Sequence, residues 1–96
     1  MIKQIEITVI GKVQGVFFRE STKGEATKLG IVGTVKNQPI GNQVFIVAHG
    51  EEEKLAELIG WCHQGPPASV VEKVEVIDVP IEEGKYHGFI IDLRRS

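Results

Sequence analysis

The spacing of hydrophobic positions divides the chain into seven segments of regular structure. Alternation of apolar and polar residues, as at Ile5, Ile7 and Val9, predicts strands with one buried face. Recurrence of apolar or small residues every three or four positions predicts helices. The predicted order is strand, helix, strand, strand, helix, strand, strand, over residues 3–10, 19–29, 31–37, 43–49, 51 to about 65, 70–79 and 86–93.

Several local features refine this division. Proline and glycine in residues 38–41 predict a tight turn that joins the second and third strands as a hairpin. The third strand is apolar on both faces and is therefore expected to be central, and Gly50 is expected to break it. The alternation of the fourth strand changes phase between Val76 and Ile77, which predicts a bulge there. Arg94 and Arg95 are expected to form a solvated tail.

The order of elements predicts an α+β fold of the ferredoxin-like α/β sandwich type, βαββαβ plus a C-terminal edge strand. This fold has an antiparallel sheet in the spatial order 4-1-3-2, with two helices on one face. The first and second strands run in the same direction with the third between them. The loop after the first strand and the end of the second therefore meet at one edge, about 9.5 Å apart.

The length of 96 residues predicts a single domain, 1–96, with one modest core. A hydrophobic content of 42% with 25% charged residues is typical of a globular chain rather than a disordered one. No apolar run approaches the ~20 residues of a membrane span, and the N-terminus lacks the basic-then-apolar pattern of a secretion signal. We therefore expect a cytoplasmic protein with no membrane partner.

The charge pattern argues against a nucleic-acid partner. Net charge is −2, and lysines are scattered among glutamates, so no basic face is predicted. An RNA-binding sheet of the same topology would also need exposed aromatic residues on its central strands. Phe45 and Phe89 are too few for that function.

The cysteine and histidines suggest no metal site and no internal disulfide. Cys62 is the single cysteine, and its place in an apolar helical pattern is typical of a small core residue. His49 and His87 have no metal-ligand spacing. We expect neither a metal nor a cofactor.

The loop between the first strand and the first helix is the strongest candidate for chemistry. Its two glycines allow several backbone N–H groups to turn inward around an anion, and it contains no acidic residue. Arg19 adds a planar charged fork that fits phosphate oxygens, at a helix start where a cation is unfavourable unless an anion is present. The alternative is a turn that binds nothing, with Arg19 paired to a nearby acid. The predicted phosphate cradle consists of Arg19 and the N–H groups of Gln14, Gly15, Val16, Phe17 and Phe18.

Asn37 ends the second strand at the same predicted edge of the sheet. Its amide can both donate and accept hydrogen bonds, so it can hold a water molecule without a shifted pKa. The alternative is that Asn37 caps its own turn.

Two motifs resemble the signatures of the acylphosphatase family, and the resemblance runs over the whole chain. The motif that resembles the first signature is Gly11-Lys12-Val13-Gln14-Gly15-Val16-Phe17-Phe18-Arg19. The motif that resembles the second signature is Gly33-Thr34-Val35-Lys36-Asn37 followed by Gly41 and Val44. This resemblance implies hydrolysis of the carboxyl-phosphate bond, with phosphate bound by Arg19 and water oriented by Asn37.

The expected partner is a small-molecule acyl phosphate, hydrolysed without a metal to carboxylate and phosphate. Inorganic phosphate or sulfate would compete for the same cradle, and we expect a monomer. The alternative is a non-catalytic module of the same fold that binds phosphate or carbamoyl phosphate, as acylphosphatase-like domains do inside larger proteins.

Overall fold

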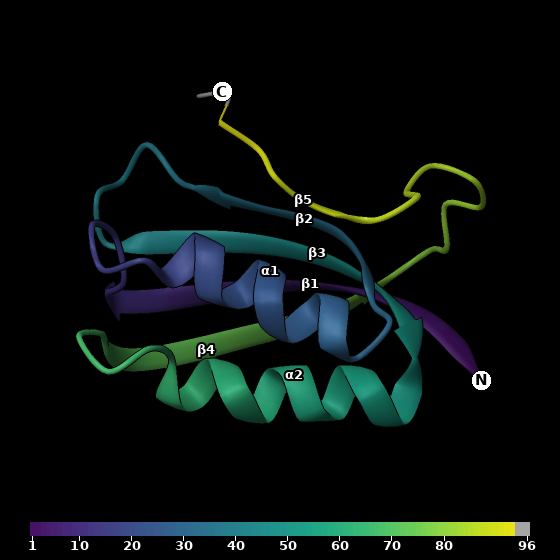
Figure 1. Cartoon of the computed structure of the whole chain (residues 1–96), viewed down its shortest axis with the longest axis horizontal. Helices are drawn as coiled ribbons and strands as arrows, with labels where there is room; N and C mark the ends of the chain where they lie inside the picture. Colours follow the sequence, from purple (N-terminus) through teal and green to yellow (C-terminus); the bar gives the residue numbers. More distant parts are fainter. Residues whose placement is uncertain (94–96) are drawn as a thin grey trace.

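Residues 1–93, which are those that the computed structural model describes, form a two-layer structure of five strands and two helices. Figure 1 shows both helices lying across one face of the sheet. This arrangement confirms the predicted ferredoxin-like sandwich. Within the same residues, no helix is long and apolar enough to cross a membrane. The elements are β1 (Ile2–Lys12), α1 (Phe18–Lys28), β2 (Val32–Asn37), β3 (Gln43–Glu51), α2 (Glu52–Gln64), β4 (Val70–Val79) and β5 (Phe89–Ile91).

The strands lie in the order β4-β1-β3-β2-β5, so the predicted 4-1-3-2 order and the central place of β3 are confirmed. The three pairs β1–β3, β1–β4 and β2–β3 are antiparallel. β5 instead pairs parallel with β2, because the connection after β4 carries the chain to the opposite edge of the sheet (Figure 1). The sheet is therefore mixed at this edge, and its last strand is much shorter than the predicted 86–93.

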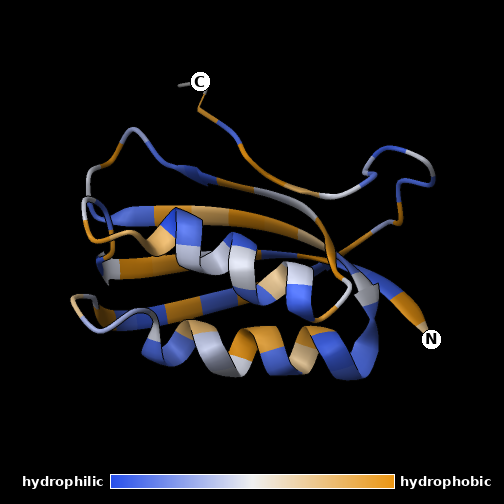
Figure 2. Ribbon diagram, in the orientation of Figure 1, coloured by the Kyte–Doolittle hydropathy of each residue, from blue (hydrophilic) through white to orange (hydrophobic). Residues whose placement is uncertain are grey.

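The core lies between the helices and the covered face of the sheet. Ile5, Ile7 and Val9 are buried on that face, as their alternation predicts. Figure 2 shows hydrophobic residues, in orange, along the strands that the helices cover. Leu58 and Cys62 form part of the buried stripe of α2. The ring of Phe18, at the start of α1, lies 5.4 Å from the ring of Trp61, which ties the two helices together.

The prediction that Gly50 breaks the third strand was wrong. β3 continues through Gly50, which pairs with Lys3, and ends at Glu51. A Cβ atom at position 50 would lie 3.2 Å from Cγ1 of Ile31, so the glycine permits close packing rather than a turn. α2 consequently begins at Glu52, with acids in its first turn as predicted.

The predicted bulge between Val76 and Ile77 was also wrong. These residues pair in regular register with Ile7 and Glu6, and the irregularity lies at Glu72 instead. β4 forms an edge of the sheet, where Val76 and Ile77 are both exposed. The change in alternation therefore reflects incomplete burial at an edge. The predicted solvated tail, Arg94 and Arg95, lies outside the described residues.

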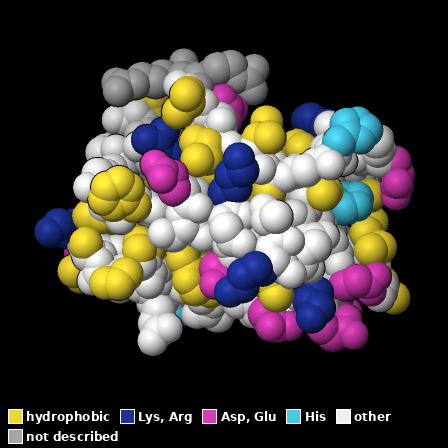
Figure 3. All heavy atoms as spheres, in the orientation of Figure 1, with side chains coloured by type: hydrophobic (Ala, Val, Ile, Leu, Met, Phe, Trp, Pro, Cys, Tyr) yellow, Lys and Arg dark blue, Asp and Glu magenta, His cyan; other side chains and the backbone are white. Residues whose placement is uncertain are grey.

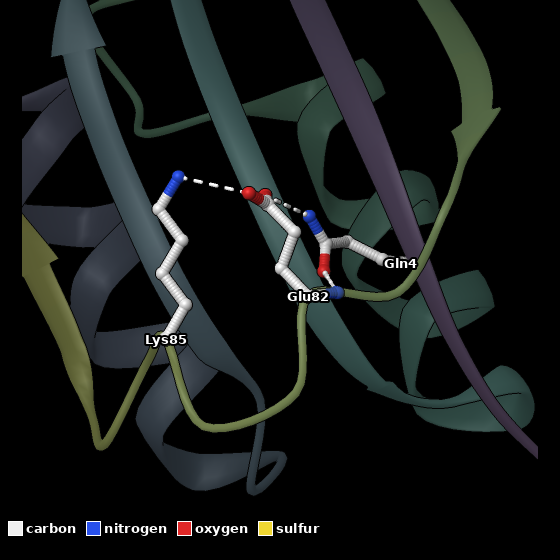
Figure 4. A network of polar contacts seen from close by, with 3 residues as sticks. All are labelled: Gln4, Glu82 and Lys85. Atoms are coloured by element: carbon white, nitrogen blue, oxygen red, sulfur yellow. Dashed lines mark hydrogen bonds and ion pairs between the residues drawn. The ribbon is translucent and has the colours of Figure 1, made fainter.

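The connection from β4 to β5 is anchored by a buried amide in β1 (Figure 4). Gln4 is only 3% exposed, and its Nε2 donates to Oε1 of Glu82 over 3.0 Å. The backbone N–H of Glu82 donates back to Oε1 of Gln4 over 2.9 Å, and Lys85 donates to Oε2 of Glu82. The hydrogen bond from Gln4, followed by that from Lys85, lowers the pKa of Glu82. This network determines where the chain crosses to reach β5.

We predict that Gln4→Leu lowers the free energy of unfolding, by roughly 1 kcal/mol for the lost backbone hydrogen bond alone. Because the folded-state pKa of Glu82 is lowered, its contribution is fully present above the ordinary carboxyl pKa of 4.5 and is lost as pH falls through the folded value. Urea unfolding at neutral and acidic pH should thus show a difference between the original protein and the variant that shrinks with acid.

The matched control is the same comparison in a Glu82→Gln background, where the carboxylate is absent and the pH dependence of the difference should disappear. A difference that is equally pH-dependent in both backgrounds would show that Glu82 is not the titrating partner.

Candidate active site

The backbone N–H groups of the β1–α1 loop have no hydrogen-bond partner among the described residues. Gly15 and Phe17 have φ angles of 72° and 62°, and among residues 1–93 Phe17 is the only residue other than glycine with a positive φ. Left-handed residues alternating with ordinary ones turn successive N–H groups toward one point. The N–H groups of residues 14–18 donate no hydrogen bond to any described residue. The loop therefore offers five backbone donors without partners in the described part of the chain, and that they converge on one anion stays a prediction.

Phe18 fixes the end of this loop. Its side chain is 1% exposed and packs on Trp61, while its carbonyl accepts a hydrogen bond from Oγ1 of Thr22. Phe17 before it is 74% exposed, and Arg19 after it is half-buried. One buried ring thus holds the first turn of α1 in place and fixes the backbone from which Arg19 extends.

Gln14 ties the loop to the β2–β3 turn. Its Nε2 donates to three backbone carbonyls of that turn, over 3.0 Å to Gln38, 3.1 Å to Ile40 and 2.8 Å to Gln43. An amide nitrogen carries two hydrogens, so one of them is shared between two acceptors. The N–H of Gly11 donates to the carbonyl of Asn42 over 2.9 Å and adds a second link. Because the turn follows Asn37 directly, these bonds set the position of Asn37 relative to the loop.

Two neighbouring cavities open at this end of the sheet, and they share Arg19, Asn37 and Leu93 as lining residues. The first is polar, with a volume of about 310 Å³. The second is more apolar, with a volume of about 460 Å³. Figure 3 shows hydrophobic side chains beside charged ones at the end of the molecule that carries the β1–α1 loop. The first cavity is also lined by Gln14, Gln38, Pro39 and Asp92, and the second by Val13, Gly15, Phe17, Phe18, Glu20 and Ile91.

Arg19 and Asn37 bring opposite hydrogen-bonding capacities to these cavities. Arg19 makes no ion pair with any acid among residues 1–93. The alternative, in which Arg19 pairs with a nearby carboxylate, therefore has no support in this part of the chain. Asn37 faces the covered side of the sheet beside Val44, and its Oδ1 is buried without a hydrogen-bond partner in the described structure. The site therefore offers donors for an anion and one acceptor for a water molecule.

Most, but not all, of the predicted site residues line the two cavities. Arg19 and Asn37 line both cavities, and Gly15, Phe17 and Phe18 line the second. The Gln14 side chain lines the first cavity but serves as the tether, and Val16 is buried and lines neither. That their backbone N–H groups bind phosphate stays a prediction.

Some functional residues were missed from the sequence. The tethering role of Gln14 has no sequence signal, since its partners are backbone carbonyls. Ile91, Asp92 and Leu93 reach the cavities only because β5 lies parallel beside β2. That pairing could not be recognised from any motif.

The remaining reactive side chains lie outside the site. Cys62 is fully buried in α2, and burial raises the pKa of its thiol to about 12, so it is protonated and unreactive at neutral pH. Across residues 1–93, no three His, Cys, Asp or Glu side chains are grouped so that they could hold a metal ion.

Comparison of the sequence with known proteins identifies one family. The sequence profile of the Acylphosphatase family matches residues 5–91. An acylphosphatase from Rubrobacter xylanophilus is 48% identical over 82 residues, which cover 85% of this chain and 74% of that protein. The structure of an acylphosphatase from Coxiella burnetii superposes with a TM-score of 0.88 at 37% identity and covers 95% of this chain and 93% of that one.

A larger protein contains a similar unit. Full-length HypF, in a crystal structure described as its phosphate- and nucleotide-bound form, superposes with a TM-score of 0.86 at 29% identity. The match covers 99% of this chain but only 12% of HypF.

We predict that Gln14→Met and Gln14→Glu both destabilise the protein and weaken its binding of inorganic phosphate. Loss of the donated hydrogen bonds in Gln14→Met should lower the free energy of unfolding by about 1–3 kcal/mol. Gln14→Glu should be worse at neutral pH, because it places a carboxylate against three carbonyl oxygens. Urea unfolding and calorimetric titration with phosphate measure the two effects. A glutamate variant as stable as the original would contradict the tether.

Proposed function

The chain belongs to the acylphosphatase family, and we propose that this enzyme hydrolyses the carboxyl-phosphate bond of acyl phosphates through the groups around its β1–α1 loop. The products are a carboxylate and inorganic phosphate. The reaction proceeds by direct attack of water on phosphorus and needs no metal, because a carboxylate is already a good leaving group. The protein's task is then to hold the phosphoryl group, neutralise its charge and direct the water in line.

The phosphoryl group binds in the cradle. The N–H groups of Gln14, Gly15, Val16, Phe17 and Phe18 donate to its oxygens, and Arg19 anchors it with a charge-assisted pair of hydrogen bonds. Each such bond contributes roughly 1.5–3 kcal/mol. What supports this assignment is the set of unpaired donors in the loop and the absence of an acidic partner for Arg19 among residues 1–93.

The observation that carries the proposed catalytic step is the buried, unpaired Oδ1 of Asn37, a residue that lines the same two cavities as Arg19. A buried acceptor without a partner is unfavourable unless a ligand or water completes it. A water that donates to this oxygen is held beside the phosphoryl group, with its lone pair free to attack phosphorus. Asn37 thereby orients the nucleophile without changing its own protonation state.

The wider setting of this activity is part of the same proposal. Residues 1–96 act as a single acylphosphatase-like domain in the cytoplasm, as a monomer without a cofactor. The substrate is a small-molecule acyl phosphate, and inorganic phosphate or sulfate competes for the cradle.

The second candidate is a binding module for phosphate or carbamoyl phosphate, and the similarity to a small part of HypF is the observation that favours it. A module of that kind needs only donors. The unpaired oxygen of Asn37 would face its anionic ligand unfavourably, which is why we prefer the enzyme.

We predict that the protein hydrolyses an aryl acyl phosphate in excess chelator and that Asn37→Ala lowers kcat by about 10²-fold or more, as loss of a positioning group can do. Phosphate binding should be retained, because the cradle remains. Asn42→Ala is the matched control, since Asn42 is exposed and lines neither cavity. If both the original and Asn37→Ala bind phosphate but neither turns over, the binding-module function is correct.

We also predict that inorganic phosphate is a competitive inhibitor and that Arg19→Lys raises its inhibition constant by about tenfold or more, because lysine lacks the planar fork. Lys23→Met, which removes an exposed cation one turn further along α1, should leave the constant unchanged. Initial rates at several phosphate concentrations measure both. Non-competitive inhibition, or equal effects of the two variants, would count against this site.

A further inference from the structure

The second cavity has a composition that phosphate binding does not explain. Large apolar side chains flank it, with Phe17 74% and Leu93 76% exposed and Ile91 half-buried. Phosphate needs only the donors of the loop and Arg19. Exposed apolar side chains grouped around a cavity mark a binding site for an apolar ligand.

The backbone at Phe17 makes its side chain more informative. With φ at 62°, this position would accept glycine without strain, whereas a bulky side chain is unfavourable there. A strained residue persists where its side chain or backbone has a function. The N–H group of Phe17 would serve the cradle equally well in a glycine, so the ring itself requires an explanation.

The geometry of the reaction supplies one. In an in-line displacement, the leaving oxygen lies opposite the attacking water. With the phosphoryl group in the cradle and the water on Asn37, the acyl group extends away from that water and out of the cradle. The cradle residues Gly15, Phe18 and Arg19 line the second cavity, so the phosphoryl group lies at its wall and the acyl group extends from there along its apolar side chains.

We infer that Phe17, Ile91 and Leu93 form a subsite for the acyl group and that the enzyme selects acyl phosphates with a large apolar acyl group, an aromatic one above all. The inference rests on the proposed function, because the cradle fixes where the acyl group begins. An aryl ring can stack on Phe17 and cover the aliphatic side chains that β5 and the residues after it bring to the cavity. Acetyl and carbamoyl groups offer far less apolar surface for these contacts.

The test compares benzoyl phosphate with acetyl phosphate, whose leaving carboxylates are of similar basicity, so that the ratio of their kcat/KM values reports contacts to the acyl group. The original protein should favour benzoyl phosphate. Phe17→Gly, which relieves the backbone strain, should lower the ratio by about tenfold, and Leu93→Ala should lower it in the same direction. Any change in the cradle that affects both substrates cancels in the ratio.

Two further variants make the comparison specific. Phe17→Tyr keeps the ring and should retain the ratio. Ile90→Ala is the matched control, because Ile90 is a 56% exposed neighbour of Ile91 in β5 and lines neither cavity. A ratio that is unchanged in Phe17→Gly and Leu93→Ala, or equally lowered by Ile90→Ala, would overturn the subsite.

Binding of non-hydrolysable analogues separates this inference from the proposed function. Calorimetric titration with benzoylphosphonate and acetylphosphonate reads the subsite without turnover. Tighter binding of the benzoyl analogue, lost in Phe17→Gly, supports the subsite even if hydrolysis fails. Equal binding of the two analogues by a protein that hydrolyses acyl phosphates overturns the subsite and leaves the proposed function intact.

Discussion

The amide of Gln14 is the contact on which the candidate site depends. Sheet topology places the end of β1 and the end of β2 at the same edge, but β3 lies between them. Pairing of Ile10 with Gln43 and the hydrogen bond from Gly11 to Asn42 fix the end of β1 against the β2–β3 turn, but the loop beyond Gly11 extends past these contacts. Three hydrogen bonds from the Gln14 nitrogen fix that loop to the β2–β3 turn. This link holds the proposed cradle close enough to Asn37 for both to act on one small molecule.

The packing beneath the loop divides the adjacent residues Phe17, Phe18 and Arg19 among different tasks. The ring of Phe18 enters the core against Trp61, which fixes the start of α1. Phe17 is left outside in a left-handed conformation, and Arg19 extends into the cavities. A shift of one position in the helix start would put Arg19 in the core and Glu20 at the cavities, and a shift in the opposite direction would put Phe18 at the cavities in place of Arg19. The burial of a single aromatic side chain therefore sets the chemistry of its neighbours.

Much of this structure could be predicted from local pattern, and the rest could not for identifiable reasons. Alternation in β1 predicts a buried face, and the connection rules for the predicted order leave β3 as the central strand, so the meeting of Arg19 and Asn37 follows from the sequence. Gly50 looks like a strand breaker, but its small size serves a contact with Ile31 that only the folded chain reveals. The parallel pairing of β5 is likewise non-local, and it supplies the apolar residues beside the site.

The two ends of β1 show how this fold separates stability from function. At one end, Gln4 and Glu82 satisfy each other and fix a long connection, while Nδ1 of His49, which pairs with Gln4 across β1 and β3, is buried without a partner in the described structure. At the other end, the loop donors and Oδ1 of Asn37 have no partner among residues 1–93, and Asn37, unlike His49, lines both cavities. Unmatched polar groups lower the stability of the empty protein. In the proposed function, a phosphoryl group and a water would supply the missing partners, so the polar groups that the scaffold leaves unpaired at this end are those that would bind substrate.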